Sequence, residues 1–443
     1  MTATGTHDLT ETRQPGSFGV AGSRSTRLLA GPPRSAGAES LASHEQRLGA
    51  LALERVDPGQ LRETIRRSGL QGRGGGEFPV GDKIDLAARS IGAPIVVVNA
   101  SEGEPASRKD RTLLELRPHL VLDGAEVAAT ATGACEIVVY LHRERTRSCS
   151  AVEVALGERR RRSASATFRV IDAPAGYISG ETSAVVSYLE GAGALPSRRP
   201  VPVAAEGVAG RPTVVHNVET LAHLGLIARL GAPWFRGSGT TQSPGSTLLT
   251  LSGAVSVPGA VIEVLRPVLV GEILSTIGGL DEVPRAVLLG GYAGTWIDGE
   301  TAWRTPIDRH ALRQAGAPLG CGLLAVLGKD RCGLAETARL AAWLATQSSG
   351  QCGPCVVGLP QLAQRARQIA NGEASRTDVR RFLALAASVR GRGACGHPTG
   401  VVDLLESAIA TFGDELTSHR RAGGCGTPAG PGSFPLPLEE ARR

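Results

Sequence analysis

Residues 68–83 read SGLQGRGGGEFPVGDK, and glycine occupies six of these sixteen positions. Glycine lets backbone N–H groups approach a ligand closely, and a nearby cation such as Arg73 or Lys83 completes a concave site for an anion, most often phosphate. A flexible surface loop is the alternative interpretation of a glycine-rich run. Phe78 and Pro79 argue against it, because proline fixes φ and phenylalanine favours burial. The stretch therefore predicts a phosphate-binding loop.

The segments around this loop indicate its architecture. Residues 59–69 before it have the pattern of a helix, whereas the usual dinucleotide fingerprint requires a strand at that place. After the loop, three β-branched runs at residues 93–100, 136–142 and 167–174 alternate with helical stretches. This alternation is typical of βαβ units, so the sequence predicts a largely parallel sheet with helices between its strands.

Carboxylates follow the first of these runs. Glu102, Glu104 and Asp110 lie in SEGEPASRKDR, at the carboxyl end of the expected strand. In open α/β sheets ligands bind at this edge, where carboxylates can hold sugar hydroxyl or amide groups. A capped turn without a ligand is the alternative interpretation.

Two further turns carry polar residues. Apolar residues at helical spacing predict a helix that begins near Ser183, capped by Thr182 or by Ser183 itself. Gly180 and Glu181 would then precede a helix N-terminus, which favours an anion or a polar ligand. Asn217 lies at another strand-to-helix turn.

The composition divides the chain into five segments. The two ends are polar and aperiodic, so we expect a disordered arm at 1–44 and a disordered tail at 419–443. Between them we expect an α/β domain at 45–243, a small β+α domain at 245–330 that opens with a hairpin around Pro258, and a helical domain at 334–418.

The composition also limits the class of protein. Of the 443 residues, 42% are hydrophobic and 20% are charged, which is typical of a soluble globular protein. No apolar run reaches the length of a membrane span and the N-terminus lacks a signal-peptide core, so we expect a cytoplasmic protein without a direct membrane span. The densest basic cluster, residues 159–162, has no interleaved aromatic residues, so no nucleic acid partner is expected.

The eight cysteines suggest metal or redox chemistry more than disulfides. Cys352 and Cys355 form a C-x-x-C pair, and Cys395 is a distant third thiol; such a set suits an iron–sulfur cluster or another metal. Ser349 stands where a C-x-x-C-x-x-C rhythm requires a further cysteine. Three residues are candidate replacements for the fourth ligand: His397, Cys425 and Cys332. Buried free cysteines are the alternative interpretation.

Four motifs in order resemble those of one family over about residues 57–412. GRGGGEFPVGDKI resembles the family's GRGGxGFPxGxKW loop for FMN phosphate, and NASEGEPASRKDR resembles NADEGEPGxxKDR. YISGETSAV and HNVETL are similar to YxCGEETAL and NNVETL. This family is the flavin-bearing, NADH-binding subunit of bacterial respiratory complex I, with the related subunits of NAD-linked hydrogenases and formate dehydrogenases.

The resemblance implies an α/β fold in which an FMN-binding Rossmann-like domain precedes a small β-grasp (ubiquitin-like) domain and a C-terminal helical iron–sulfur bundle. It implies that the following residues bind flavin or nucleotide: Gly72, Arg73, Gly74, Phe78, Lys83, Asn99, Glu102, Glu104, Tyr177, Gly180, Glu181 and Asn217. It also implies that a 4Fe-4S or 3Fe-4S cluster is held at four positions, namely Ser349, Cys352, Cys355 and Cys395.

The activity that the resemblance implies is that of an FMN-dependent electron-input oxidoreductase of the NADH dehydrogenase type. A reduced nicotinamide, NADH or NADPH, would pass hydride to FMN, and single electrons would leave to an iron–sulfur cluster or to an iron–sulfur or ferredoxin-like acceptor protein. Because the flavin carries out the chemistry, no catalytic side chain is expected. The resemblance also suits a place at the periphery of a membrane-bound complex.

The sequence departs from the family pattern at positions near the expected ligands. Glu77 replaces a glycine, Ser101 an aspartate, Thr182 a glutamate beside the nicotinamide, and Ser349 the first cluster cysteine. Loss of the carboxylate at Thr182 predicts slower and less selective use of NADH. Two alternatives follow: a degenerate paralogue that keeps the fold and FMN as a binding or scaffold subunit without NADH turnover, or a zinc-stabilised three-cysteine module without a redox role.

Overall fold

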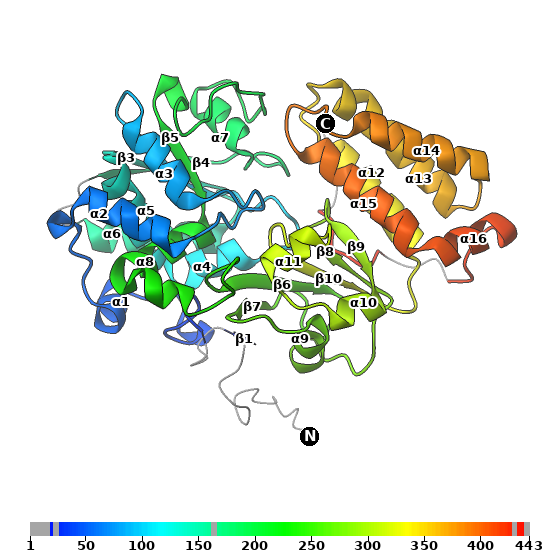
Figure 1. Ribbon diagram of the computed structural model, residues 1–443, viewed down its shortest axis with the longest axis horizontal. Helices are drawn as coiled ribbons and strands as arrows, with labels where there is room; N and C mark the ends of the chain where they lie inside the picture. The colour runs from blue at the N-terminus through cyan, green and yellow to red at the C-terminus, as the bar shows by residue number, and fades with distance from the viewer. Residues whose placement is uncertain (1–17, 21–25, 161–165, 428–431, 438–443) are drawn as a thin grey trace.

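The computed structural model describes residues 18–20, 26–160, 166–427 and 432–437. Figure 1 shows three regions that the chain visits in order: a parallel sheet with its helices, a mixed sheet, and a bundle of helices. No helix in this described part of the chain is long and apolar enough to cross a membrane.

The first sheet is parallel and has the strand order β4-β3-β2-β5. Its strands are β2 (Ile95–Ala100), β3 (Glu136–Leu141), β4 (Thr167–Asp172) and β5 (Thr213–Asn217). The first three coincide with the three β-branched runs, so the predicted parallel sheet is confirmed. The helices of this region are α1 (Leu41–Leu48), α2 (Pro58–Ser68), α3 (Val80–Arg89), α4 (Lys109–Leu116), α5 (Pro118–Thr132), α6 (Thr146–Arg159), α7 (Thr182–Leu189) and α8 (Val218–Arg236), with short turns η1 (Arg34–Ala36), η2 (Leu53–Arg55) and η3 (Val208–Gly210).

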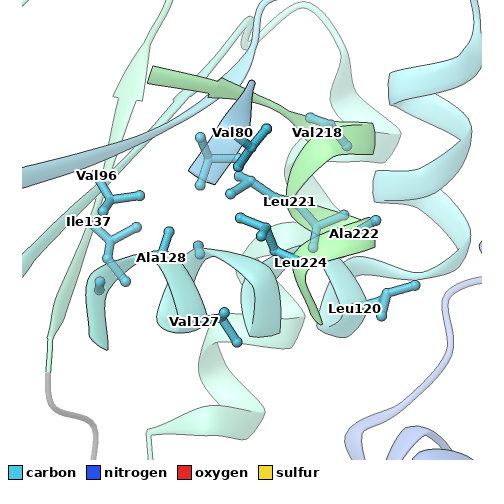
Figure 2. Packing of buried hydrophobic residues seen from close by; sticks show 14 of the residues in the cluster. Val80, Val96, Leu120, Val127, Ala128, Ile137, Val218, Leu221, Ala222 and Leu224 are labelled. Carbon is cyan, nitrogen blue, oxygen red and sulfur yellow. The ribbon is translucent and has the colours of Figure 1, made fainter. Parts of the chain in front are cut away.

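Helices α5 and α8 cross in close contact against this sheet. A Cβ atom at Gly124 would overlap the carbonyl oxygen of Leu221, and one at Gly225 would lie 2.9 Å from the carbonyl oxygen of Leu120. Glycine at both positions therefore allows the two backbones to meet. Figure 2 shows side chains of both helices packing together with sheet residues such as Val96.

The second sheet is mixed and has the strand order β1-β7-β6-β10-β8-β9. Its strands are β1 (Phe18–Gly19), β6 (Thr247–Gly253), β7 (Val261–Val264), β8 (Ala286–Leu289), β9 (Thr295–Asp298) and β10 (Leu323–Leu327), and its helices are α9 (Val270–Thr276), α10 (Gly299–Arg304) and α11 (Arg309–Gln314). Strands β6 and β7 pair antiparallel, which confirms the predicted hairpin. Strand β10 pairs parallel with β6 and antiparallel with β8.

The last region is helical. It contains α12 (Gly333–Thr346), η4 (Pro354–Gly358), α13 (Leu359–Ala370), α14 (Arg376–Val389), α15 (His397–Thr411) and α16 (Gly413–Ala422). Helix α14 begins with a capping box between Ser375 and Asp378. Apolar side chains of α12, α13, α14 and α15 form one buried cluster, which extends to β8 and β10 of the second sheet.

The start of the described chain differs from the disordered arm expected at 1–44. Strand β1 pairs with β7 of the second sheet. Leu28 and Leu29 are fully buried, and their backbone N–H groups donate to the carboxylate of Glu263 at 2.9 and 3.1 Å. The guanidinium of Arg117 donates to the carbonyl oxygens of Leu29, Ala30 and Pro32. Partners far along the chain therefore order this polar segment.

The structure also differs from the disordered tail expected at 419–443, because part of this segment is ordered. Helix α16 continues to Ala422, and the side chain of Phe434 is buried. The backbone N–H groups of Ser433 and Phe434 donate to the carboxylate of Glu336 at 3.0 and 3.2 Å. The parts of both predictions that concern residues 1–17, 21–25, 428–431 and 438–443 lie outside the described residues.

Candidate functional site

A cavity of about 630 Å³ lies where the three regions meet. Its size is that of a site for a small molecule or a cofactor. Gly290 and Gly320 from loops of the second-sheet region and Cys395 and His397 from the helical region line it. Among the predicted binding residues, the following line it as well: Gly72, Gly74, Phe78, Lys83, Asn99, Glu102, Glu104, Tyr177, Gly180, Glu181 and Asn217.

The glycine-rich loop forms one wall with its backbone. The N–H group of Gly72 donates to the carbonyl oxygen of Phe78 at 2.9 Å, which closes the loop. Within the described residues, the N–H groups of Gly74, Gly75 and Gly76 have no hydrogen-bond acceptor. Gly75 has a φ of 103°, a conformation that favours glycine. Three successive free donors make this wall suited to an anion.

Two residues of the loop differ from their predicted roles. The Arg73 side chain is not among those that line the cavity; its guanidinium donates to the carbonyl oxygen of Pro244 at 3.0 Å, and burial chiefly lowers its pKa to about 9. Arg73 therefore offers no cation to the cavity. Phe78, which was expected to be buried, is 57% exposed and lies at the cavity wall.

Lys83 is the cation that the loop does present. Its Nζ atom donates to the carbonyl oxygen of Val215 at 3.0 Å, and burial lowers its pKa to about 8. The neighbouring His216 is also buried, and burial and Lys83 together lower the pKa of its imidazole. A buried ammonium group beside free N–H donors would be stabilised by a bound anion.

Glu102 is held by its own loop. Its carboxylate accepts hydrogen bonds from the Ser107 hydroxyl at 2.7 Å, the Asp110 N–H at 3.1 Å and the Arg111 guanidinium at 2.9 Å. Burial opposes ionisation, but Arg111 and these hydrogen bonds outweigh it and lower the pKa of Glu102. The capped-turn interpretation therefore describes Glu102 well.

Glu104 is held by other parts of the chain. Its Oε2 atom accepts from the Tyr177 hydroxyl at 3.2 Å and from the Tyr292 N–H at 2.9 Å. A Cβ atom at Gly291 would lie 2.7 Å from the same oxygen, so glycine is needed there. Burial raises the pKa of Glu104 to about 7. Its buried Oε1 atom has no hydrogen-bond partner among the described residues, so it is available to a ligand.

The amide of Asn99 and the turn before α7 form the next part of the wall. The Asn99 side chain donates to the carbonyl oxygen of Gly180 at 2.7 Å. Glu181 is the N-cap of α7, because its carboxylate accepts from the N–H groups of Ser183 and Ala184 at 2.9 and 3.0 Å. The prediction that Thr182 or Ser183 caps this helix is therefore wrong: α7 begins at Thr182, and the Glu181 side chain accepts from its free N–H groups.

A buried ionic cluster adjoins Asn217; the sequence analysis named its Asp110 but not its Lys109. The Lys109 Nζ atom lies 2.7 Å from Asp110, 3.0 Å from Glu219 and 3.1 Å from the Asn217 side chain. Burial opposes its charge, but the two carboxylates outweigh burial and raise the pKa of Lys109. The cluster fixes the orientation of Asn217 at the cavity wall. The sequence did carry a signal for this cluster: Lys109 and Asp110 are adjacent in the motif NASEGEPASRKDR.

The three predicted cluster cysteines come together at the helical side of the cavity. Cys352, Cys355 and Cys395 lie close enough together to influence one another's pKa, and burial chiefly raises the pKa of the Cys355 thiol to about 12. Cys395 also lines the cavity. Ser349 is half-buried in the segment between α12 and η4 that leads to Cys352. Three convergent thiols suit a soft metal or an iron–sulfur cluster.

Cys332 and Cys425 do not join this group, whereas the buried Nδ1 atom of His397 has no hydrogen-bond partner among the described residues, so His397 stays a candidate ligand. The Nε2 atom of His397 donates to the carbonyl oxygen of Leu344 at 2.9 Å. Cys332 precedes α12 and Cys352 follows it, and the fourteen residues of that helix span about 20 Å. Cys425 lies with Cys332. The replacement hypothesis is therefore wrong for both cysteines.

A cavity of cofactor size, with free backbone donors at one wall and a three-thiol group at another, defines a class of protein that binds an anionic cofactor beside a metal or cluster centre. Residues 65–225 match the family described as the Nuo51 FMN-binding domain, and residues 335–419 match the NADH-ubiquinone oxidoreductase-F iron-sulfur binding region. Both matches occur in the predicted order.

Two curated relatives are similar over most of their length. The NADH-quinone oxidoreductase F 2 subunit of Rhizobium meliloti is 33% identical over 384 residues, which cover 83% of this chain and 90% of that protein. The NADH-quinone oxidoreductase F subunit of Mycobacterium bovis is 32% identical over 401 residues, which cover 86% and 90%. The chain therefore belongs to the family of NADH-quinone oxidoreductase F subunits, and the family that the motifs predict is confirmed.

A solved structure is similar as well. The crystal structure of an NAD+-reducing NiFe-hydrogenase in the H2-reduced state contains a chain that matches with a TM-score of 0.77 and 29% identity. The match covers 85% of this chain and 66% of that chain, so this protein spans about two thirds of the hydrogenase chain. The similarity confirms the predicted relation to NAD-linked hydrogenases.

Proposed function

We propose that this protein is the electron-input flavoprotein of a larger oxidoreductase, which oxidises NADH through FMN and passes electrons on through an iron–sulfur cluster. The observation that carries the proposal is that the glycine loop, Lys83 and Cys395 border one cavity. FMN, when bound, supplies a two-electron acceptor for hydride that can release electrons singly. Because Cys395 lines the same cavity as the glycine loop, a cluster held there would lie beside a flavin bound in the cavity.

The loop wall is suited to FMN. The free N–H groups of Gly74 to Gly76 and the ammonium of Lys83 would hold its phosphate. The Asn99 and Asn217 amides would orient the polar edge of its ring, and the exposed ring of Phe78 offers apolar contact area. A Cβ atom at Gly74 would lie 3.3 Å from Asn217, so only glycine leaves room for close backbone approach.

The nicotinamide nucleotide would bind on the side of Glu104 and Tyr177. The unpartnered Oε1 atom of Glu104 offers a hydrogen bond to an amide or a ribose hydroxyl. Tyr177 packs edge-on against Trp343 of α12, so its hydroxyl is held in place beside Glu104. Thr182 lines the same cavity where the family carries a carboxylate.

Cys352, Cys355 and Cys395 would hold a 4Fe-4S or 3Fe-4S cluster, with Ser349 as the weak or open fourth position. Serine can ligate iron through oxygen, and ligand identity is a main determinant of the reduction potential of a cluster. These residues lie in the region that matches the iron–sulfur model of the family. The zinc module and the scaffold subunit are the outcomes that the experiments below distinguish.

The layout of the chain supports a role inside a complex. We divide the chain into an α/β domain of 45–243, a β-grasp-type domain of 245–330 and a helical domain of 334–418; one hydrophobic cluster lies mainly around β2 to β5, a second lies within the β6 to β10 region, and a third joins α12 to α15 to β8 and β10. The relatives are named as subunits, so we expect an iron–sulfur or ferredoxin-like partner subunit to receive the electrons.

Anaerobic titration of the purified protein tests this function. We expect denaturation to release FMN, and NADH to bleach the flavin absorbance of the intact protein. Gly74→Val should abolish flavin binding, whereas Gly157→Ala on α6, a position outside the cavity with nothing within 4 Å of an added Cβ, should retain it. Bound flavin that NADH does not reduce would support the scaffold alternative. A folded protein that binds no FMN after reconstitution would contradict the proposal.

Iron analysis tests the cluster. We expect iron and acid-labile sulfide after anaerobic reconstitution, with an EPR signal of a three-iron cluster that Ser349→Cys converts into that of a four-iron cluster. Cys149→Ser on α6 is the matched control, because this half-buried thiol lies outside the site. Zinc without sulfide at the three thiols would favour the zinc module. Absence of iron in both the wild type and Ser349→Cys would refute the cluster.

A further inference from the structure

A second group of metal-ligand side chains lies away from the cavity. Cys332, Glu415, His419 and Cys425 place one sulfur, nitrogen or oxygen atom each within 4.8 Å of the others. None of the four lines the cavity, and α12 separates Cys332 from the cluster cysteines. Cysteine and histidine together are the usual ligands of zinc in structural sites.

The spacing of the ligand atoms is that of a tetrahedral site. The Cys332 Sγ atom lies 3.4 Å from the His419 Nε2 atom and 3.2 Å from the Glu415 Oε2 atom. With zinc–sulfur bonds of about 2.3 Å and zinc–nitrogen or zinc–oxygen bonds of about 2.0 Å, the edges of a tetrahedron are about 3.5 Å long. The two distances from Cys332 are therefore close to those of a tetrahedral zinc site, and all four ligand atoms lie within 4.8 Å of one another.

Contacts behind the ligands fix their orientation. The His419 Nδ1 atom faces the carbonyl oxygen of Ala370 at 2.5 Å; a carbonyl only accepts, so Nδ1 carries the proton and the Nε2 lone pair faces Cys332. This arrangement of a second hydrogen bond behind the ligating nitrogen is typical of metal-bound histidine. Arg285 forms an ion pair with the other oxygen of Glu415 and balances part of the negative charge.

Helix capping explains only part of this group. The Glu415 carboxylate accepts from the N–H groups of Gly333 and Leu334 at 3.2 and 3.1 Å, and Cys332 is the N-cap of α12. Capping gives no reason for an imidazole lone pair and a second thiol to converge on the same point. Glu415 and His419 lie one turn apart on α16, and Cys425 follows the end of that helix, so one ion could join all three to the start of α12.

We propose that Cys332, Glu415, His419 and Cys425 bind a zinc ion that ties α16 and the segment after it to the N-terminus of α12. Binding replaces the two thiol protons by Zn–S bonds and releases them to solvent. Glu415 and His419 are buried, whereas both cysteines are half-buried, which leaves a path for the ion. Downstream of the site, Phe434 stacks on Tyr292, whose N–H group donates to Glu104. The ion would thus stabilise a segment that supports the cavity wall.

Metal analysis of the full-length protein tests this proposal. Reduced protein is loaded with Zn²⁺ alone, dialysed, and analysed for zinc and iron. We expect about one zinc per chain in the wild type, and at least a fivefold loss in Cys425→Ser with no change in iron. Cys395→Ser is the matched control, because it removes a cluster thiol and should keep the zinc. Equal zinc in the wild type and Cys425→Ser, or none in the wild type, would overturn the proposal.

Cobalt gives a second measurement, which begins with the wild-type protein. Titration of the reduced wild-type protein with Co²⁺ should produce thiolate-to-cobalt absorption and the intense visible bands of a tetrahedral ion. A chelator should then lower the Tm of the wild type but not that of Cys425→Ser, whose fold is checked by circular dichroism. Octahedral cobalt spectra would overturn the proposal. So would a Cys332–Cys425 disulfide in protein isolated under thiol-blocking conditions, because it would consume both sulfur ligands.

Discussion

Glu102 and Glu104 stand two residues apart on the loop after β2, and the structure holds them in opposite ways. Glu102 accepts hydrogen bonds from its own loop, including Arg111, and its pKa is lowered. Glu104 accepts from Tyr177 and Tyr292 of distant segments, and burial raises its pKa to about 7. One side of the cavity is therefore built from local contacts, and the other exists only because separate regions dock.

The largest effect is expected where the glycine loop meets the second sheet region. Glu77 and Arg309 form a buried ion pair at 2.9 Å, and Arg313 joins them from a half-exposed position. Glu77→Gln leaves the Arg309 charge buried without its partner, so we expect the free energy of unfolding to fall by about 3–5 kcal/mol. Arg313→Gln should cost about 1 kcal/mol or less. Chemical denaturation measures the free energy of unfolding of both variants. Equal losses would show that the buried Glu77–Arg309 pair contributes no more to stability than the half-exposed Arg313 contact.

Glu104 makes the contrast with Glu102 measurable as a pH dependence. Its folded pKa of about 7 lies above the ordinary value of 4.5, so its stabilising contribution is present below about pH 4.5 and is lost as the pH rises through 7. Glu104→Gln removes this loss, so the variant should exceed the wild type in stability by up to about 3 kcal/mol above about pH 7 and approach it at about pH 5. Denaturation curves across this pH range provide the test.

Glu102→Gln is the matched control for Glu104→Gln. The pKa of Glu102 is lowered, chiefly because Arg111 outweighs burial, so its contribution is present above the ordinary pKa and is lost on acidification. This variant should therefore be less stable than the wild type at neutral pH. If both variants change stability in the same direction, the proposed difference between the two carboxylates is wrong.

Lys83 belongs to the side of the cavity that is built from local contacts, and its contribution can be measured through FMN binding. Lys83→Met should weaken binding by about 1.5–3 kcal/mol, roughly 10- to 150-fold in Kd, because it removes a charged hydrogen bond to phosphate. Its pKa of about 8 in the free protein means that wild-type affinity should hold below about pH 8 and fall above it, where binding must take up a proton. Fluorescence titration measures both, with the exposed Lys329→Met as the unaffected control.

The smallest effect concerns NADH, the proposed hydride donor. Thr182→Glu restores a carboxylate at the cavity wall, and we expect NADH to reduce the flavin roughly fivefold faster, about 1 kcal/mol in the barrier, with a smaller gain for NADPH. Thr182→Gln has the same length without the charge and should give no gain. Stopped-flow absorbance follows the reaction. Fast wild-type reduction that Thr182→Glu leaves unchanged would contradict the predicted weak use of NADH.

Much of the site was predictable because its residues are neighbours in the sequence. The glycine loop, the carboxylates after β2 and the C-x-x-C pair are contiguous, so their spacing already constrains their geometry. Individual roles were less predictable. Arg73 does not line the cavity because its guanidinium donates to the carbonyl oxygen of Pro244, and the Glu181 carboxylate accepts from N–H groups of α7.

The sequence by itself determined the parallel sheet, the hairpin, the glycine loop and the family, since periodicity and contiguous motifs report on local structure. Only the tertiary structure decided which atoms meet across regions. It buries Leu28 against Glu263, aligns Glu104 with Tyr292, and brings Cys332 to His419. Such contacts join residues far apart in the chain, and their free energy depends on burial and on distances that no local pattern encodes.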